Sequence, residues 1–278
     1  MKKLKVLLAF LTIFTLVLAG CGKQEEKTAS ASKEKKEVKV GTSPGPYSEL
    51  FLNGVKPILE KKGYKIKAVE FNDLQQADVA LADGGVDLNV DQHTAYMENF
   101  NANSKSNLVS ITPIPTVPAG IFPGKKKSLK DIKSGDTIAV PNDASNAARA
   151  YALLQKAKLI KLKDGVELAK ATAADIGDNP LNLKIVEMDS AQIPRTLQDV
   201  DYGVIPGSIV YASKTDPDSK LLSEDILPHL VLVAVVDKAN KDSQWAKDVA
   251  AAYQSDEFKD YMKEHNKNDY WFIPDELK

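Results

Sequence analysis

The sequence predicts an α/β fold of two lobes that are joined by two chain crossings. Strand-like segments alternate with helix-like segments between residues 38 and 205, an order typical of a parallel or mixed sheet with helices on both faces. Three prolines between residues 113 and 118 and the pair Pro206-Gly207 interrupt this order, because proline suits an extended crossing better than a sheet ladder. Only one strongly apolar strand, Leu230–Val236, follows, and a single strand cannot build a separate domain. We therefore expect the C-terminal part to return to the first lobe.

The first lobe begins with a short strand in which Val38 and Val40 alternate with lysines. The next helix has one apolar face, formed by residues at i, i+4, i+7 and i+8: Phe51, Val55, Ile58 and Leu59. Gly63 ends this helix, and Pro57 predicts a late start or a kink. The other elements expected here are strands at residues 65–71, 86–90 and 108–111 and helices at residues 74–82 and 93–101.

A second α/β cycle starts after the prolines with a short helix that contains Leu129 and Ile132. Strands at residues 137–140, 184–186 and 202–205 and a helix at residues 145–158 follow, and the C-terminal part adds helices at residues 244–253 and 257–265. These elements place the first lobe at residues 37–115 and 208–278 and the second lobe at residues 116–207.

The N-terminus has the features of a secretory signal. Three lysines within the first five residues precede an apolar run, Val6–Ala19, which is too short and one-sided for a membrane span. The run ends in Leu-Ala-Gly-Cys at Cys21, the only cysteine, and resembles the bacterial lipoprotein signal that is cleaved before a lipidated cysteine. We expect removal of residues 1–20, a diacylglycerol anchor on Cys21 at the extracytoplasmic face of the cell membrane, and a flexible tether over residues 21–36.

The composition argues against several functional classes. The 37 basic and 38 acidic residues nearly balance, so no global field would recruit nucleic acid. The three histidines, His93, His229 and His265, lack neighbouring ligands at metal-binding spacing. Phosphate-binding, dinucleotide-binding and nucleophile-elbow motifs are absent from the sequence, so we expect no metal, no cofactor and no catalytic step.

The first candidate site is the stretch Gly84–Phe100. An apolar strand leads into a polar turn with Asp91, Gln92 and His93, and Tyr96 follows one helical turn later. Because strand ends hold ligands in open α/β folds, His93 and Tyr96 are candidates for one wall of a crevice. A capped helix with a packed tyrosine is the alternative. Asp91 is a candidate partner for a ligand amine, or equally the N-cap of the helix.

The second candidate is Arg149. Only Arg149 and Arg195 are arginines in this lysine-rich chain, and planar, bidentate carboxylate binding is a task that lysine performs poorly. Arg149 lies early in a helix that Ser145 or Asn146 could cap, where free N–H groups also favour an anion. We interpret Arg149 as a carboxylate clamp and Arg195 as structural, with a surface ion pair as the alternative for both.

Several motifs together resemble those of the NlpA family, the methionine-binding lipoproteins of bacterial ABC importers. They are the lipoprotein signal, V-D-L-N-V-D-Q-H-T-A-Y, V-P-N-D-A-S-N-A-A-R-A-Y-A-L-L-Q with L-I-K-L-K-D-G, and N-L-K-I-V-E-M-D-S-A-Q-I-P-R-T-L-Q-D-V-D. The resemblance covers the chain from Val38 onward. It implies a two-lobed periplasmic-binding-protein fold of type II that delivers an amino acid to a membrane permease with its ATPase. It also implies ligand contacts from His93, Tyr96 and Arg149, and Asp91, Asn146 and Leu74 are further candidate ligand-binding residues.

This sequence departs from the family pattern at four positions of the implied pocket. Asp91 and Leu74 stand where the family usually has aromatic residues, and Pro206 and Val231 stand where it has asparagines. Fewer aromatic walls weaken the case for a thioether, and Asp91 could replace lost polar partners of an ammonium group. Methionine is thus the leading ligand, and another amino acid or a short peptide is the alternative. A lipoprotein used in adhesion and an envelope hydrolase are further alternatives.

Overall fold

The structure, a computed structural model, describes residues 35–267 and 270–278. The expected signal peptide, the lipidated Cys21 and all but the last two residues of the tether lie outside the described residues. Within the described part, no helix has both the length and the apolar character needed to cross a membrane.

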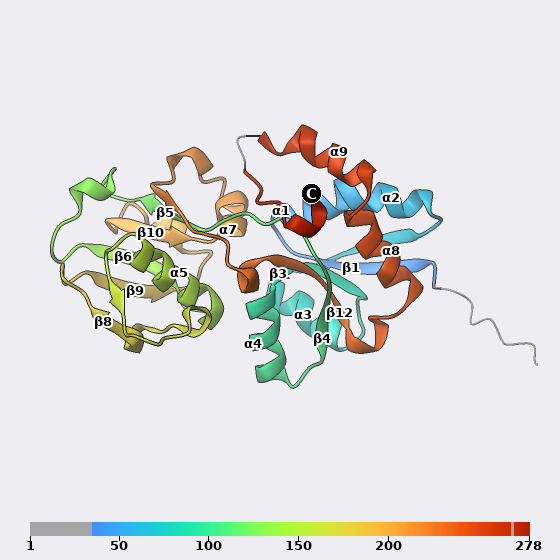
Figure 1. Cartoon of the computed structure of the whole chain (residues 1–278), viewed down its shortest axis with the longest axis horizontal. Helices are drawn as coiled ribbons and strands as arrows, with labels where there is room; N and C mark the ends of the chain where they lie inside the picture. The colour runs from blue at the N-terminus through green and yellow to red at the C-terminus, as the bar shows by residue number, and fades with distance from the viewer. Residues whose placement is uncertain (1–34, 268–269) are drawn as a thin grey trace, which may run out of the picture. The chain divides into compact units, whose positions relative to one another are not determined.

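The first sheet has five strands in the order β2-β1-β3-β12-β4 (Figure 1). The first three are parallel, whereas β12 runs antiparallel to both of its neighbours. Their bounds are β1 (Glu37–Thr42), β2 (Lys65–Glu70), β3 (Leu88–His93), β4 (Leu108–Pro113) and β12 (Leu232–Asp237). The late strand β12 therefore lies inside the sheet, as a return of the C-terminal part requires.

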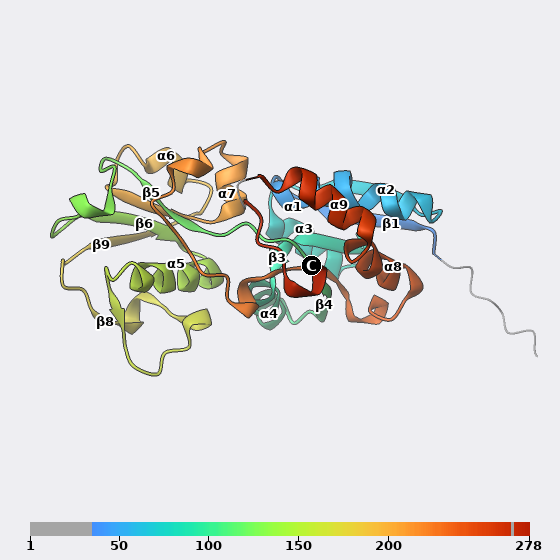
Figure 2. The same ribbon diagram turned by 45° about the horizontal axis from the view of Figure 1, so that its top comes forward.

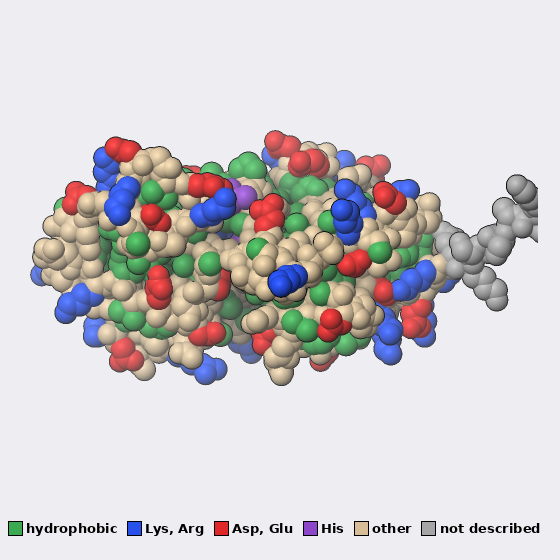
Figure 3. Space-filling model, turned by 90° about the horizontal axis from the view of Figure 1, so that it is seen from below, with side chains coloured by type: hydrophobic (Ala, Val, Ile, Leu, Met, Phe, Trp, Pro, Cys, Tyr) green, Lys and Arg blue, Asp and Glu red, His purple; other side chains and the backbone are tan. Residues whose placement is uncertain are grey.

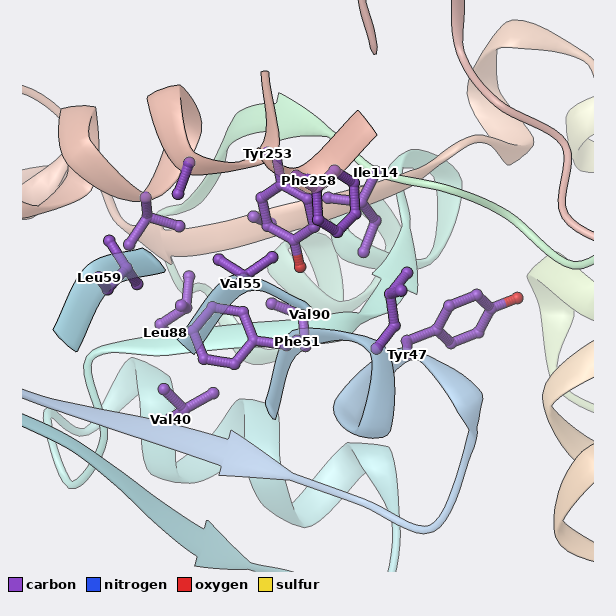
Figure 4. Packing of buried hydrophobic residues seen from close by; sticks show 14 of the residues in the cluster. Val40, Tyr47, Phe51, Val55, Leu59, Leu88, Val90, Ile114, Tyr253 and Phe258 are labelled. Carbon is purple, nitrogen blue, oxygen red and sulfur yellow. The ribbon is translucent and has the colours of Figure 1, made fainter. Parts of the chain in front are cut away.

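Helices cover both faces of this sheet. One face carries α1 (Pro46–Leu50), α2 (Lys56–Lys61), α8 (Gln244–Tyr253) and α9 (Asp256–His265), and the other carries α3 (Leu74–Ala82) and α4 (Thr94–Ser104). On the first face, Phe51 and Leu59 pack with Leu88 of the sheet and with Tyr253 and Phe258 of the C-terminal helices (Figure 4). The apolar spacing seen in the sequence is therefore the spacing of a core face.

A π-helical turn, Phe51–Val55, joins α1 to α2 directly before Pro57. Proline has no N–H to donate and its ring clashes with the preceding turn, so a locally wider helix accommodates it. The kink predicted at Pro57 thus takes the form of a π turn within one continuous helical segment.

The second sheet has the order β11-β5-β10-β6-β9. Its strands are β5 (Gly120–Pro123), β6 (Thr137–Pro141), β9 (Lys184–Met188), β10 (Tyr202–Ile205) and β11 (Leu222–Ser223), with a separate pair of β7 (Lys161–Leu162) and β8 (Ile176–Asp178). Helix α5 (Ala144–Lys156) packs on β6 (Figure 2), and the short helices are α6 (Ile193–Thr196) and α7 (Gly207–Ala212).

The two sheets with their helices confirm the predicted two-lobed α/β fold with two crossings. The predicted division at residue 208 places β11 in the first lobe, whereas β11 pairs with β5 of the second sheet. The return crossing therefore starts after Ser223 rather than at Gly207, because Pro206-Gly207 begins helix α7 instead of leaving the lobe.

Candidate functional site

Strand β3 does not end at Val90 as predicted but continues to His93. His93 and Gln92 pair with Leu232 and Val233 of β12, and the register then shifts so that Asn89 faces Val235. Three steps along β3 thus match two steps along β12, which defines a β-bulge. Bulges redirect side chains and are frequent beside functional sites.

The bulge sorts the side chains of β3 onto two faces. Asn89 and Gln92, three residues apart, hydrogen-bond to each other on the side of α3. Val90 and Asp91 both lie on the side of α1, where Val90 joins the core and Asp91 contacts Ser48. A regular strand would place Val90 and Asp91 on opposite faces, so the bulge is what brings Asp91 to α1.

His93 is the N-cap of α4, which excludes Asp91 from that role. Its Nδ1 accepts the backbone N–H of Tyr96 at 3.2 Å, and the side chain belongs to a residue that is 4% exposed. Burial and then the positive charge of Arg149 lower the pKa of His93 to about 3, whereas the side chain of Asn146, which lies near the ring, opposes this. A neutral ring that accepts at Nδ1 carries its proton on Nε2. That Nε2–H is buried and meets no hydrogen-bond acceptor among the described residues.

Tyr96 stands edge-on to His93, with 6.3 Å between the ring centroids and 89° between the ring planes. Burial raises the pKa of its hydroxyl, so Tyr96 stays neutral. Its ring lines a cavity of about 440 Å³ that also touches Val79 of α3, Phe100 of α4 and Ser145 at the start of α5. The cavity therefore adjoins elements of both lobes.

Arg149 is buried in α5, and its side chain is committed to a partner that the sequence did not reveal. The Nε and Nη2 groups donate to the two carboxylate oxygens of Glu224, and Nη2 also donates weakly to the carbonyl of Val117 at 3.4 Å. Glu224 accepts the backbone N–H of Ala119 as well. Arg149 is therefore tied to the first crossing through Val117 and to the return crossing through Glu224.

The helix that carries Arg149 is capped by Asp143 rather than by Ser145 or Asn146. The Asp143 carboxylate accepts the backbone N–H of Asn146 at 3.0 Å and also bonds the Asn146 side-chain amide. Sequence reasoning missed this cap because four polar candidates lie within five residues at the start of the helix, Asn142, Asp143, Ser145 and Asn146, and only the geometry decides among them. Asn146 is thereby oriented on the first turn, close to His93.

The Asp91 carboxylate binds the segment that leads from β1 into α1. The carboxylate accepts the N–H and the hydroxyl of Ser43 at 2.9 and 2.8 Å and the hydroxyl of Ser48 at 2.8 Å. Burial raises the pKa of Asp91, and these hydrogen bonds oppose the rise. The Ser48 hydroxyl also approaches the second oxygen, Oδ1, at 3.0 Å.

The remaining departures from the family pattern lie at element boundaries. Leu74 is the first residue of α3 and is half-buried, but the residues of α3 that line the cavity are Gln75 and Val79. Pro206 caps α7. Val231 directly precedes β12, and its carbonyl accepts the N–H of Thr94, next to His93, at 3.4 Å.

The charged residues of the site do not belong to a larger charged surface. The molecular surface carries both signs of charge. Figure 3 shows basic and acidic side chains interspersed on one face of the protein. Across residues 35–267 and 270–278, no group of three or more His, Cys, Asp or Glu side chains could hold a metal ion. The structure thus brings His93, Tyr96, Asn146 and Arg149 together around buried donors, with Asp91 two residues before His93 on β3.

Comparisons with known proteins identify the family and its fold. The sequence profile described as NlpA lipoprotein matches residues 38–273. The D-methionine-binding lipoprotein MetQ of Salmonella typhi is 38% identical over 248 residues, 88% of this chain and 89% of that protein. A nutrient-binding protein of Burkholderia cenocepacia solved with bound methionine is 38% identical with a TM-score of 0.78, covering 85% of this chain and 99% of the other. The substrate-binding protein of a Streptococcus pneumoniae methionine transporter is 34% identical with a TM-score of 0.77, covering 86% and 96%.

Proposed function

Because the chain belongs to the NlpA lipoprotein family, we propose that it is the solute-binding lipoprotein of an ABC importer and holds methionine between its lobes. The names of its relatives support this ligand. The site residues proposed for it are His93, Tyr96, Asn146 and Arg149, with Asp91 as the partner of the ammonium group.

The observation that carries this proposal is the unpartnered Nε2–H of His93. A buried donor without a partner costs about 1–3 kcal/mol, and such a group persists where a ligand satisfies it. Since the imidazole is neutral and protonated at Nε2, it can donate to a carboxylate oxygen but cannot accept from an ammonium group. His93 therefore belongs to the carboxylate end of the ligand.

Arg149 supplies the positive charge at the same end. Glu224 and Val117 take the Nε and Nη2 donors, and no hydrogen bond within the described residues uses Nη1. A ligand carboxylate would therefore approach Arg149 end-on, from Nη1, rather than along the edge that Glu224 occupies. The resident pair fixes the guanidinium plane in advance, and preorganised donors lose less entropy on binding.

The other end of the ligand requires an acceptor for the ammonium group and an apolar wall. Asp91 Oδ1 receives the Ser48 hydroxyl, and a carboxylate oxygen can accept further donors. Tyr96 and Phe100 line the cavity, and their rings suit a thioether, because sulfur contacts aromatic edges favourably. This cavity, of about 440 Å³, is lined by none of His93, Asn146, Arg149 and Asp91, so it would receive the side-chain end of the ligand. A short peptide is the second candidate.

The finer cellular role is also a proposal. The lipoprotein signal and Cys21 support attachment of the mature protein to the outer face of the cell membrane, where it would hand the ligand to a permease with its ATPase. The protein would perform no catalytic step of its own. If a Cys21→Ser variant fractionated with membranes as fully as the natural protein, the proposed anchor would be wrong.

Calorimetry on protein freed of co-purified ligand tests the ligand class. We expect saturable one-to-one binding of methionine, and methioninamide should bind roughly 10- to 100-fold more weakly, because it lacks the charged group that His93 and Arg149 would hold. Glycyl-methionine and non-sulfur amino acids test the alternatives. The proposal fails if neither an amino acid nor a dipeptide binds.

The variant Arg149→Gln/Glu224→Gln tests the clamp without leaving a buried charge unpaired. It should prefer methionine over methioninamide less strongly than the natural protein does, because only His93 then holds the carboxylate. If it still preferred methionine as strongly as the natural protein does, Arg149 would not be the carboxylate clamp.

A further inference from the structure

A second buried polar group, Asp78 on α3, plays no part in the site just described. Asp78 is 0% exposed. Its Oδ1 accepts the side-chain N–H of Gln92, whereas its Oδ2 has no partner in the part of the chain that the structure describes. Within the same residues, the Oε1 of Gln92 is likewise buried without a partner. The two side chains thus share one hydrogen bond, and each has one unsatisfied acceptor on the same planar group.

The orientation of the Gln92 amide is fixed by its surroundings. Its Nε2 donates to Asp78 and, at 3.2 Å, to the side-chain oxygen of Asn89. That Asn89 oxygen also accepts the backbone N–H of Asp91 at 2.9 Å, and the Asn89 amide donates to the carbonyl of Gly41 at 3.3 Å. Rotating the Gln92 amide by half a turn would place its oxygen against two acceptors, so Oε1 must find its donor elsewhere.

One proton resolves both unsatisfied acceptors. If Asp78 is a neutral acid with its proton on Oδ2, it can donate to Oε1 of Gln92 while Oδ1 continues to accept from Nε2. The result is a planar ring with two hydrogen bonds, the pairing of a carboxylic acid with a primary amide. We propose that Asp78 is a neutral carboxylic acid in such a ring with Gln92 and thereby positions the bulged end of β3 that carries Asp91 and His93.

The charges around Asp78 favour this state. Burial and then the negative charge of Asp91 raise the pKa of Asp78 to about 8, against the lowering effect of the Gln92 hydrogen bond. Tyr96 of α4 is the other titratable group that senses Asp78, and it is neutral. On this side of the sheet β12 presents Val233 and Val235, and β1 presents Gly41, which does not titrate.

The position of Gln92 links this ring to the ligand. Gln92 stands between Asp91 and His93 in the sequence, so its side chain anchors the backbone that sets the direction of both neighbours. Ionised Asp78 would face the Oε1 of Gln92 with two acceptors and no proton, and the ring would open. The effect on ligand affinity rests on the proposed function, but the protonation state of Asp78 does not.

The test measures the unfolding constants of the natural protein and of Asp78→Asn between pH 5 and 9. The amide of Asp78→Asn can form the same ring without a titratable proton. The Asp78 carboxyl should keep its proton in the folded protein up to about pH 8 but lose it near pH 4 when unfolded. The stability that Asp78 contributes is therefore greatest below pH 4 and decreases as the pH rises towards 8. The unfolding constant of the natural protein, divided by that of Asp78→Asn, should rise up to about tenfold per pH unit and level off above 8. Asp83→Asn, at the exposed end of the same helix, is the matched control. The ratio of unfolding constants between the natural protein and Asp83→Asn should not change with pH.

Two further measurements separate positioning from mere stability. Infrared spectra of protein with labelled aspartate should show a protonated carboxyl at pH 7 that Asp78→Asn lacks. Asp78→Asn should retain methionine affinity at all pH values, whereas Asp78→Leu should lose at least tenfold at each pH, because Gln92 is left without its partner. The proposal would be overturned by a ratio of unfolding constants that is independent of pH, or by the absence of a protonated carboxyl at pH 7. If no variant binds methionine at all, the proposed function fails, while the stability and infrared data still decide the state of Asp78.

Discussion

Neutralising Glu224 should reveal how strongly the two crossings depend on the buried pair with Arg149. Both side chains are 4% exposed, and removing one member of a buried ion pair costs about 3–5 kcal/mol because the other charge stays buried. Glu224→Gln keeps an oxygen that can accept the N–H of Ala119, so we expect a loss near the lower limit, about 3 kcal/mol. Arg149→Gln should cost a similar amount, since it leaves Glu224 charged and buried.

Urea unfolding of the two single variants and the double variant measures the coupling. Replacing both members of a buried pair is often nearly neutral, so the double variant should be more stable than either single variant. Asp225→Asn provides a matched control, because Asp225 follows Glu224 directly but forms an ion pair with Lys156 while 76% exposed; its loss should stay below about 1 kcal/mol. Losses that add within about 0.5 kcal/mol would refute the buried-pair reasoning.

Three other changes test separate parts of the site. His93→Ala should weaken methionine binding roughly 10- to 100-fold through loss of one charge-assisted hydrogen bond. The affinity of the natural protein should not follow a histidine titration between pH 5.5 and 7.5, since the pKa of His93 is about 3. A titration midpoint near pH 6.5 in calorimetry would contradict this. Ser48→Ala should lower the free energy of unfolding by about 1 kcal/mol, because Asp91 loses one donor, whereas an unchanged urea midpoint would mean that solvent replaces the hydroxyl. Gly207→Ala should cost about 1–3 kcal/mol, since an added Cβ would stand 2.5 Å from Val117, and a melting temperature equal to that of the natural protein would show that this crossing can move.

Much of the fold follows from sequence because most elements have a clear period. The helix face of Phe51, Val55 and Leu59 and the apolar strand that became β12 needed no tertiary information. Strand β3 was different: its last three residues are polar, and only pairing with β12 keeps them in the sheet. Strands β5 and β11 are too short for any period to be read.

The functional residues also divide into those that the sequence could predict and those that it could not. His93, Tyr96 and Arg149 were accessible through residue type, spacing and family resemblance. Glu224 was not, because Glu224 and Asp225 are adjacent acidic residues in an irregular segment, and no pattern distinguishes the buried one from the solvated one. The sequence does contain a signal for Asp78. This residue lies three residues before Leu81 on the buried face of α3, and an acid on an apolar helix face requires a partner.

The placement of β12 between β3 and β4 also sets the order in which the molecule can be completed during secretion. Residues 232–237 follow every strand of the second sheet in the chain, and until they emerge from an export channel β3 and β4 would have no neighbour on their facing edges. Unpaired edges are open to association with other chains, so the emerging polypeptide would benefit from envelope chaperones that cover them. The bulge that directs Asp91 and His93 exists only in register with β12. Hence ligand binding can begin only near the end of export, and the extracellular solute cannot assist the folding of the segments that precede it.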